Sequence, residues 1–266
     1  MPPGPVYPAV HADFTASQAA MLAAQLKNEQ QAPGFQQAFQ LFSEARYMEA
    51  IRAFEPLAAH GNSMAIYYIG RAIQFGRPAD LDSKYSEFVI PDYFLKAAML
   101  DNPYAMVFLD KYGTYRSQES TVRWRERAYQ YWTIRAAAKD PEAFSSLAII
   151  GADMDSINNM ARGAYLGDTT SLFLLFNNVN MKEPKRTAII TIDNEYPDWH
   201  EVAISRMKVL ADQGNPLAQY KYGYYVLDYD YIRKAADQCL PIASFGLSIN
   251  YNNWGGGGGG GGGMIT

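Results

Sequence analysis

The fold is decided by the stretch Leu57–Ala65, with the sequence LAAHGNSMA, because the same pattern returns at Leu210–Ala218 as LADQGNPLA. In both stretches an alanine stands near the end of a helix-forming run and Gly-Asn interrupts that run. A second alanine follows seven residues after the first. A pattern that recurs within one chain indicates a repeat protein, so further copies are expected on either side.

Four more copies keep this spacing, with small residues seven apart around a break that contains Asn, Asp, Gly or Pro. They are Ala98 with Ala105, Ala136 with Ala143, Ala236 with Ala243 and, as a weaker copy, Ala164 with Ser171. The chain therefore contains about six copies of one unit, and a unit of this length holds a pair of helices.

Each break contains residue types that start a helix. The side chain of Asn or Asp accepts a hydrogen bond from the first turn of a helix, and proline at the first helical position has no N–H to lose. The predicted caps are Asn62, Asn102, Asp140, Asp168 and Asn215, and the predicted prolines are Pro103, Pro141, Pro216 and Pro241. Small residues beside the break let two antiparallel helices approach closely. We predict an all-α fold, an α-solenoid of stacked antiparallel helix pairs; the alternative is a non-repetitive helical bundle with coincidental alanines.

Composition agrees with a helical, globular chain. Hydrophobic residues make up 48% of its 266 residues, enough for a large core. Nine of the 21 glycines form one run, so the rest of the chain is poor in glycine, which suits long helices. A net charge of −4 disfavours nucleic acid or an anionic membrane as the main partner, and no apolar run is long enough to span a bilayer.

Both ends differ from the middle, which gives three expected segments. Residues 1–12 hold four prolines and read as an extended tether. Such a tether often follows a signal peptide or a lipid anchor, so a precursor with one of these is expected. Residues 13–254 form the predicted repeat domain, and residues 255–266, with the glycine run, read as a linker or an artefactual tail.

The repeat units resemble the Sel-one-like repeat family, which is related to the tetratricopeptide repeat. Ala218-Gln219-Tyr220 followed by Gly223 matches the second half of the family pattern. The first half is matched at Phe94–Ala98 and at Ile232–Ala236. The resemblance covers about residues 35–250 and implies the solenoid fold. Residues 15–31 are expected to form an extra N-terminal helix that caps the stack.

The segment from residue 181 to 201 is longer than a tight solenoid needs. Thr187–Ile192 is rich in β-branched residues and could form a short strand. The loop that follows mixes carboxylates with aromatic rings, which suits an interface. Its predicted partner-binding residues are Asp193, Glu195, Tyr196, Asp198 and Trp199. The plainer interpretation is a solvated connection in which Trp199 packs on its own helix.

A tyrosine-rich segment near the end of the repeats is the second candidate surface. Six tyrosines lie between residues 220 and 231, with Asp228 and Asp230 among them. Tyrosine combines an apolar ring with a polar tip and is favoured at binding surfaces. The residues predicted to bind a partner are Tyr224, Tyr225, Asp228, Tyr229 and Asp230; the alternative is that rings at helical spacing belong to the core.

The sequence offers little catalytic material. One cysteine and three histidines without paired spacing predict no metal site. Cys239 reads as a packed thiol rather than a nucleophile. No cofactor and no catalytic residue are predicted.

The family resemblance implies adaptors and scaffolds, among them bacterial immunity proteins that neutralise toxins of type VI secretion. The predicted function is therefore a non-enzymatic protein that binds one secreted toxin, such as a phospholipase effector, one to one and blocks its active site. The loop carboxylates would complement a basic phosphate pocket. The alternative is a general adaptor that assembles a signalling or envelope complex. A periplasmic location is expected, with the cytoplasm as the alternative.

Overall fold

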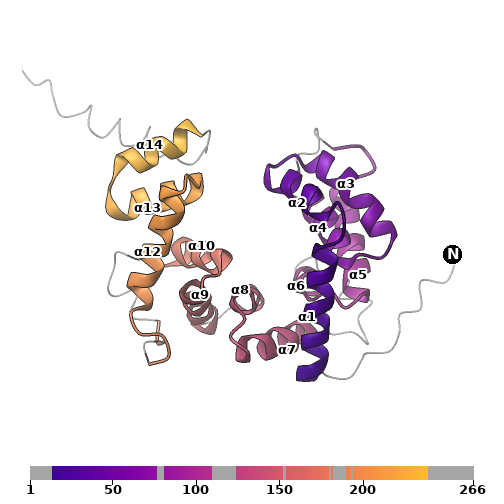
Figure 1. The fold of residues 1–266 in the computed structure, drawn as a ribbon, viewed down its shortest axis with the longest axis horizontal. Coiled ribbons are helices and arrows are strands. Elements are labelled where there is room, and N and C mark those ends of the chain that lie inside the picture. Colours follow the sequence, from indigo (N-terminus) through magenta and orange to yellow (C-terminus); the bar gives the residue numbers. More distant parts are fainter. Residues whose placement is uncertain are drawn as a thin grey trace, which may run out of the picture. The chain divides into compact units, whose positions relative to one another are not determined.

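The computed structural model describes residues 14–76, 81–109, 124–151, 154–179, 181, 190–192 and 194–238, and its secondary structure there is helical throughout. The predicted all-α class is therefore confirmed. The chain divides at Gly151 into two compact units, where the sequence predicted one repeat domain. Unit 1 is coloured indigo to magenta in Figure 1, and unit 2 is coloured from magenta-pink to yellow.

Unit 1 consists of two leading helices followed by three helix pairs. The leading helices are α1 (Ala16–Gln30) and α2 (Phe35–Ser43). The pairs are α3 (Tyr47–Ala59) with α4 (Ser63–Phe75), α5 (Ile90–Met99) with α6 (Pro103–Leu109), and α7 (Trp124–Ala137) with α8 (Pro141–Ile150); a short 3-10 helix, η2 (Glu87–Val89), precedes α5. Each helix from α2 to α8 packs against the next, so consecutive pairs are stacked as predicted.

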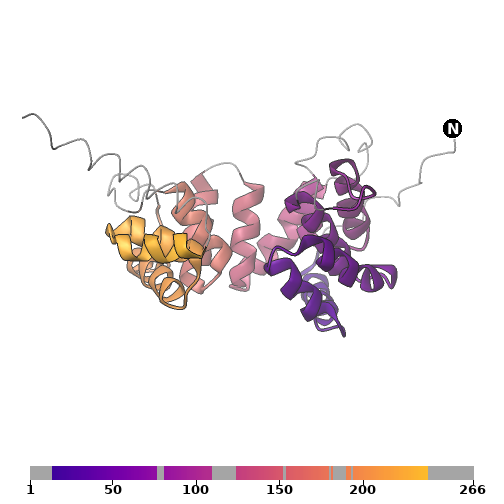
Figure 2. The same cartoon turned by 90° about the horizontal axis from the view of Figure 1, so that it is seen from above.

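Unit 2 continues the same plan. It contains α9 (Met154–Leu166) with α10 (Thr169–Asn178), then α12 (Trp199–Asp212) with α13 (Pro216–Val226), and finally α14 (Tyr229–Asp237). Helix α12 packs on α9, which joins the two pairs, and α14 packs on α13. Figure 2 shows α14, in yellow, against the orange helices of this unit.

The five predicted N-caps are confirmed, and each of them makes the same kind of hydrogen bond. The side-chain oxygens of these residues accept from backbone N–H groups at the start of the following helix, at 2.7 to 3.2 Å. The caps are Asn62, Asn102, Asp140, Asp168 and Asn215. Pro141 and Pro216 stand in the first turn of their helices and Pro103 begins α6, also as predicted; Pro241 lies outside the described residues.

The turn before each cap has a feature that the sequence analysis did not identify. The residue immediately preceding the cap adopts a left-handed backbone, and the N–H of the cap donates to a carbonyl five residues earlier. This is the arrangement that closes a helix C-terminus. Glycine fills the left-handed position in three turns, whereas Asp101 and Lys139 fill it in the other two.

Close packing between pairs depends on a small residue in the second helix. A Cβ added to Gly223 of α13 would lie 2.8 Å from the carbonyl oxygen of Asp228 and 2.9 Å from Ile232 of α14. A Cβ on Gly70 of α4 would lie 3.0 Å from the ring of Phe94 in α5. Both glycines stand eight residues after their N-cap, so the same position of the repeat meets the next pair in each unit.

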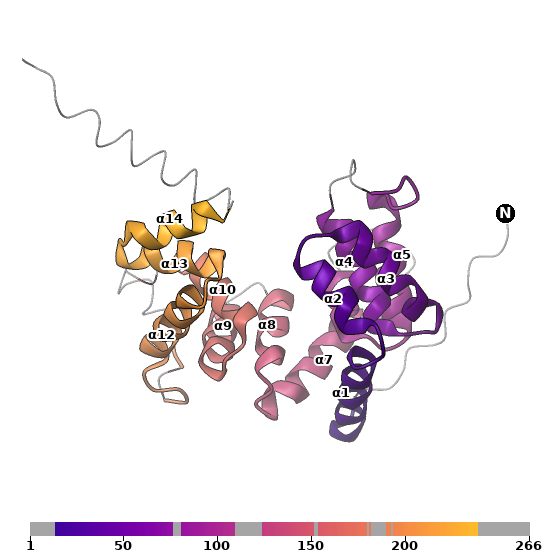
Figure 3. The ribbon, with the colours of Figure 1, turned by 45° about the horizontal axis from the view of Figure 1, so that its top comes forward.

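Helix α1 departs from the prediction of a helix that caps the end of the stack. It packs on α2, α4 and α7, so it runs from the third pair back to the first, as Figures 1 and 3 show. The terminal position is taken by α2, whose Phe35 and Ala38 are buried next to α3. The residues that α1 buries are Ala19, Leu22 and Leu26.

Polar contacts hold the C-terminal end of α1. The carboxylate of Glu29 accepts hydrogen bonds from the Ser63 hydroxyl at 2.7 Å and from the backbone N–H of Met64 at 2.9 Å. These donors belong to the first turn of α4, where a negative charge is favoured. The side chain of Asn102 donates in turn to the Ser63 hydroxyl at 3.1 Å. One network therefore links α1 to the turns of the first two pairs.

Two further expectations concern unit 2 and membranes. Of the predicted strand Thr187–Ile192, only residues 190–192 are described, and they are not in a strand; the rest lies outside the described residues.

Among the helices that the structure describes, none is long and apolar enough to cross a bilayer.

The shared turn predicts opposite effects for two matched substitutions. Lys139→Gly should raise the free energy of unfolding by about 1 kcal/mol, because glycine adopts the left-handed backbone without strain. Gly61→Ala should lower it by about 1 kcal/mol, and a Cβ there meets no atom within 4 Å, so the effect is purely backbone. Urea unfolding measures both; effects of the same sign would contradict the shared turn.

The Glu29 network predicts that Glu29→Ala lowers the free energy of unfolding by about 2 kcal/mol, because the two donors in α4 lose a charged acceptor. The matched control is Glu87→Ala, an exposed glutamate in η2, with an expected change below about 0.5 kcal/mol. Urea unfolding followed by circular dichroism gives both values. Equal effects of the two substitutions would show that Glu29 does not fasten α1.

Candidate functional site

The loop before α12 is folded back onto unit 2 rather than extended into solvent. The backbone N–H groups of Glu195 and Tyr196 both donate to the carbonyl of Ile192, which forms a turn. The ring of Tyr196 then packs on that of Tyr165 in α9, with 5.0 Å between ring centroids. Burial, together with the nearby Glu195, raises the pKa of Tyr196.

Both aromatic side chains of this loop, which were predicted to bind a partner, are buried. Tyr196 is 8% exposed and Trp199 is 4% exposed. The Trp199 ring lies against His200, whose Nε2 is 3.1 Å from the carbonyl oxygen of Met181. The burial of Trp199 agrees with the plainer interpretation, in which it packs on its own helix, and its role in binding a partner stays a prediction. Trp199 is the first residue of α12 and shares the buried face of this helix with Ala203, Met207 and Ala211.

The carboxylates of the loop have mixed positions. Glu195 is exposed and forms an ion pair with Arg162 of α9 at 3.0 Å. Asp198 is exposed and has a left-handed backbone at the start of α12, without a side-chain capping bond. Asp193 lies outside the described residues. A binding role for these acidic side chains stays a prediction. The two aromatic side chains of the loop are buried and do not lie beside them on the surface.

The tyrosine-rich segment behaves differently, because its exposed residues cluster around one break. Helix α13 ends at Val226, the next residue Leu227 has a left-handed backbone, and Asp228 caps α14 by accepting from the N–H of Asp230 at 2.9 Å. This tight break turns four large side chains outward: Tyr224 at 63% exposure, Val226 at 40%, Leu227 at 66% and Tyr229 at 41%. We call these four residues, with Asp230 beside them, the terminal patch.

The other tyrosines of the segment form the support of the terminal patch. Tyr225 is half-buried and meets Phe176 of α10 edge-on, with 6.2 Å between centroids; burial raises its pKa. The Tyr222 ring packs on Tyr231, whose hydroxyl donates to Asp212 of α12. Half of the segment is therefore structural, as the alternative proposed. Sequence reasoning missed Val226 and Leu227, although their position directly before the capping Asp228 signals a helix end.

The exposed acidic residues near the patch are solvated. Asp230 forms a surface ion pair with Arg233 at 3.1 Å, with both side chains more than half exposed. Such pairs are weak, so the carboxylate remains able to meet a partner. In the described part of the chain no three His, Cys, Asp or Glu side chains come together as a metal site. Cys239 lies outside the described residues.

Comparison with known proteins places the chain among distant structures only. No family model matches the sequence, and no curated protein matches it. A protective antigen of uropathogenic Escherichia coli strains, which displays an SLR fold, aligns over 86% of this chain with 16% identity and a TM-score of 0.41. A Sel1 repeat protein from Oxalobacter formigenes aligns over 94% of this chain and 98% of its own, with 18% identity and a TM-score of 0.37.

The chain spans half the length of the Escherichia coli structure that it matches. At these TM-scores neither likeness carries an argument about function. The resemblance to the Sel-one-like repeat family, read from Gly223 and the residues before it, therefore stays a prediction.

The contrast between loop and patch predicts unequal effects on stability. Trp199→Ala should lower the free energy of unfolding by about 3 kcal/mol, because a buried ring leaves a cavity. Tyr224→Ala should change it by less than about 0.5 kcal/mol, since the ring is exposed. Thermal and urea unfolding measure both. A small effect of Trp199→Ala on the free energy of unfolding would contradict the burial of its side chain in the core.

Proposed function

We propose that this chain is a non-enzymatic helical repeat protein that binds another protein through the terminal patch of unit 2. The observation that carries the proposal is the exposure of four large apolar or aromatic side chains within six residues. Contiguous exposed apolar surface of this kind marks interaction sites in soluble proteins. Tyrosine is also among the residues that contribute most to binding energy.

The packing beneath the patch supports this reading. Tyr224 and Tyr229 stand on either side of a break that Asp228 caps, and Tyr225 anchors α13 to α10. A surface held by fixed helices loses little conformational entropy when it binds. Residues on the patch can therefore contribute their buried area to affinity, while Tyr222 and Tyr231 keep the two helices in place.

Acidic residues next to the patch favour a basic partner. Asp230 is exposed beside the patch, Asp228 is partly buried next to it, and the chain carries a net charge of −4. Complementary charge speeds association and excludes partners of like charge.

The finer proposal is that the partner is a secreted bacterial toxin, such as a phospholipase effector, with a basic pocket for its phosphate. The chain would then act as an immunity protein, one to one, in the periplasm.

The second candidate is a scaffold that assembles an envelope or signalling complex. It is favoured by the separation of the chain into two compact units, each with its own surface. A scaffold binds two or more partners and leaves their activities unchanged. An immunity protein binds one enzyme and suppresses it.

The patch predicts site-specific capture of the partner in living cells. Benzoylphenylalanine placed at Tyr224 should cross-link to one partner protein upon irradiation. The control is the same amino acid at Tyr129, which is 53% exposed in unit 1. Mass spectrometry identifies the adducts. Identical adducts at both positions, or none at Tyr224, would contradict the proposal.

The captured protein then separates the two candidates. Leu227→Asp should weaken its affinity by about a hundredfold, as expected for a central interface residue. If the partner is an enzyme, an equimolar amount of the wild-type chain should suppress its activity, and the Leu227→Asp variant should fail to do so. Binding without suppression would favour the scaffold.

A further inference from the structure

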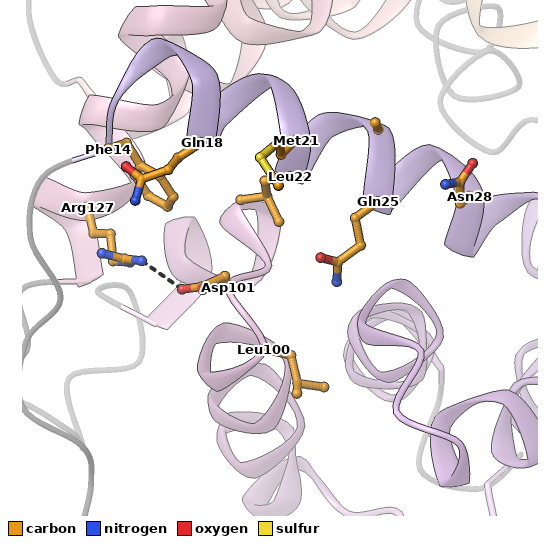
Figure 4. Close-up of a pocket in the computed structure, with 10 residues that line it drawn as sticks. Phe14, Gln18, Met21, Leu22, Gln25, Asn28, Leu100, Asp101 and Arg127 are labelled. Carbon is orange, nitrogen blue, oxygen red and sulfur yellow. Dashed lines mark hydrogen bonds and ion pairs between the residues drawn. The ribbon is translucent and has the colours of Figure 1, made fainter.

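A second surface lies in unit 1, between α1 and the turn that joins α5 to α6. Helix α1, this turn and α7 line an open groove of about 720 Å³. This volume is within the range of ligand sites. One wall is a stripe on α1 that contains Gln18, Met21, Gln25 and Asn28. Figure 4 shows Leu22 and Gln25 reaching from α1 toward the opposite wall, which carries Leu100 and Asp101.

The groove exists because α1 crosses the stack instead of covering its end. Its C-terminal end is fastened by Glu29 to the first turn of α4. Near its N-terminal end, the ring of Phe14 packs edge-on against Tyr131 of α7, with 5.6 Å between centroids. Between these two attachments α1 bridges the turn at Leu100, and a gap is left beneath it.

The charges that line the groove neutralise one another. Arg127 of α7 forms an ion pair with Asp101 at 2.8 Å, shown as the dashed line in Figure 4. The same guanidinium lies over the ring of Phe14, 4.2 Å from its centroid, and only 11% of the Arg127 side chain is exposed. Arg127 and Asp101 are the charged residues among those that line the groove, so the lining has no net charge to attract a phosphate or a carboxylate. The lining is therefore complementary to an uncharged ligand.

The remaining polar groups are side-chain amides, which both donate and accept hydrogen bonds. Two of them are held in place from outside the groove. The Oε1 of Gln18 accepts from the backbone N–H of Thr15 at 2.9 Å, and the Nε2 of Gln25 donates to Glu29 at 3.0 Å. From Gln18 to Asn28 the stripe is about 15 Å long at 1.5 Å per residue. An extended chain of four or five residues has about the same length.

Apolar side chains complete the lining. Met21 is 70% exposed and Leu100 is 40% exposed, while Leu22 is buried at 7% beneath them. An exposed methionine adapts its shape to different apolar partners at small cost. A groove that combines ordered amides with such a surface fits a polypeptide, whose backbone presents N–H and C=O groups and whose side chains supply apolar contacts.

We propose that this groove binds an extended, uncharged peptide segment of a partner protein, four or five residues long, with an apolar side chain inserted between Met21 and Leu100. This site goes beyond the proposed function, because it uses residues of unit 1 and none of the terminal patch. Its affinity is expected to be independent of the patch residues.

The test uses the full chain and a phage-displayed library of random peptides of about nine residues, long enough to span the groove. Peptides enriched on the wild-type chain should carry an uncharged core with at least one apolar residue. A fluorescein-labelled synthetic copy of the most enriched peptide is then titrated with each variant by fluorescence anisotropy.

Matched tryptophan substitutions on α1 distinguish the groove from the rest of the helix. Ala24 is exposed and lines the groove, whereas Ala20 is exposed on the same helix and does not line it. Ala24→Trp should weaken peptide binding more than about tenfold, and Ala20→Trp should change it by less than about twofold. Leu100→Asp, on the opposite wall, should also weaken binding. Leu227→Asp in the terminal patch should leave it unchanged.

Two controls keep the outcome decisive. Urea unfolding of Ala24→Trp and Ala20→Trp must give similar midpoints, so that loss of binding does not reflect detachment of α1; if Ala24→Trp unfolds early, Leu100→Asp decides the result. The proposal is overturned if no peptide is enriched, if the enriched peptides are charged at their core, or if Ala24→Trp and Leu100→Asp both bind as the wild type does.

Discussion

The structure depends on one hydrogen bond that is made six times among the described helices, from a backbone N–H at the start of a helix to the side chain of an Asn or Asp. The unpaired N–H groups at a helix N-terminus need an acceptor, above all where the turn is buried. Asn102 is fully buried, and its side chain both caps α6 and donates to Ser63 of the neighbouring turn. The caps therefore fix where the second helix of each pair begins, and Asn102 also connects the second pair to the first.

Helix α1 uses the same chemistry from outside the pairs. Its Glu29 reaches the first turn of α4, so a carboxylate from another helix adds to the capping by Asn62. Because this attachment and Phe14 hold α1 across the turns, the groove beneath it is a consequence of the way the N-terminal segment is fastened. In unit 2 the capping Asp228 has a similar consequence, since the break that it closes exposes Tyr224 and Leu227.

Much of the fold could be predicted from the sequence because its signals are local. A cap such as Asn62, a proline such as Pro216 and the alanines around each break act within one turn of helix, so their positions in the sequence determine their roles. The left-handed residue before each cap was missed because two of the five turns have Lys139 or Asp101 at this position instead of the glycine that marks a left-handed backbone. The course of α1 was also missed, since it depends on Glu29 meeting Ser63, 34 residues away.

The candidate site was less predictable for a related reason. Tyr196 and Tyr224 were both predicted to bind a partner, yet one packs on Tyr165 and the other is 63% exposed. Exposure depends on which helix lies opposite, and a single sequence does not contain that information. The groove in unit 1 was not predicted from the sequence, because Gln25 and Met21 form part of a groove only once α1 lies across the turn at Leu100.

Amide hydrogen exchange at the capped positions tests the central claim most directly. The backbone N–H groups of Ala65, Ala105, Ser171 and Ala218 donate to the capping side chains in both units. A residue in the first turn of a helix has no acceptor within that helix, so protection there reports the cap itself. The account predicts slowed exchange at all four amides. Exchange at the rate of an unstructured chain at these positions, in a protein that is otherwise helical, would contradict it.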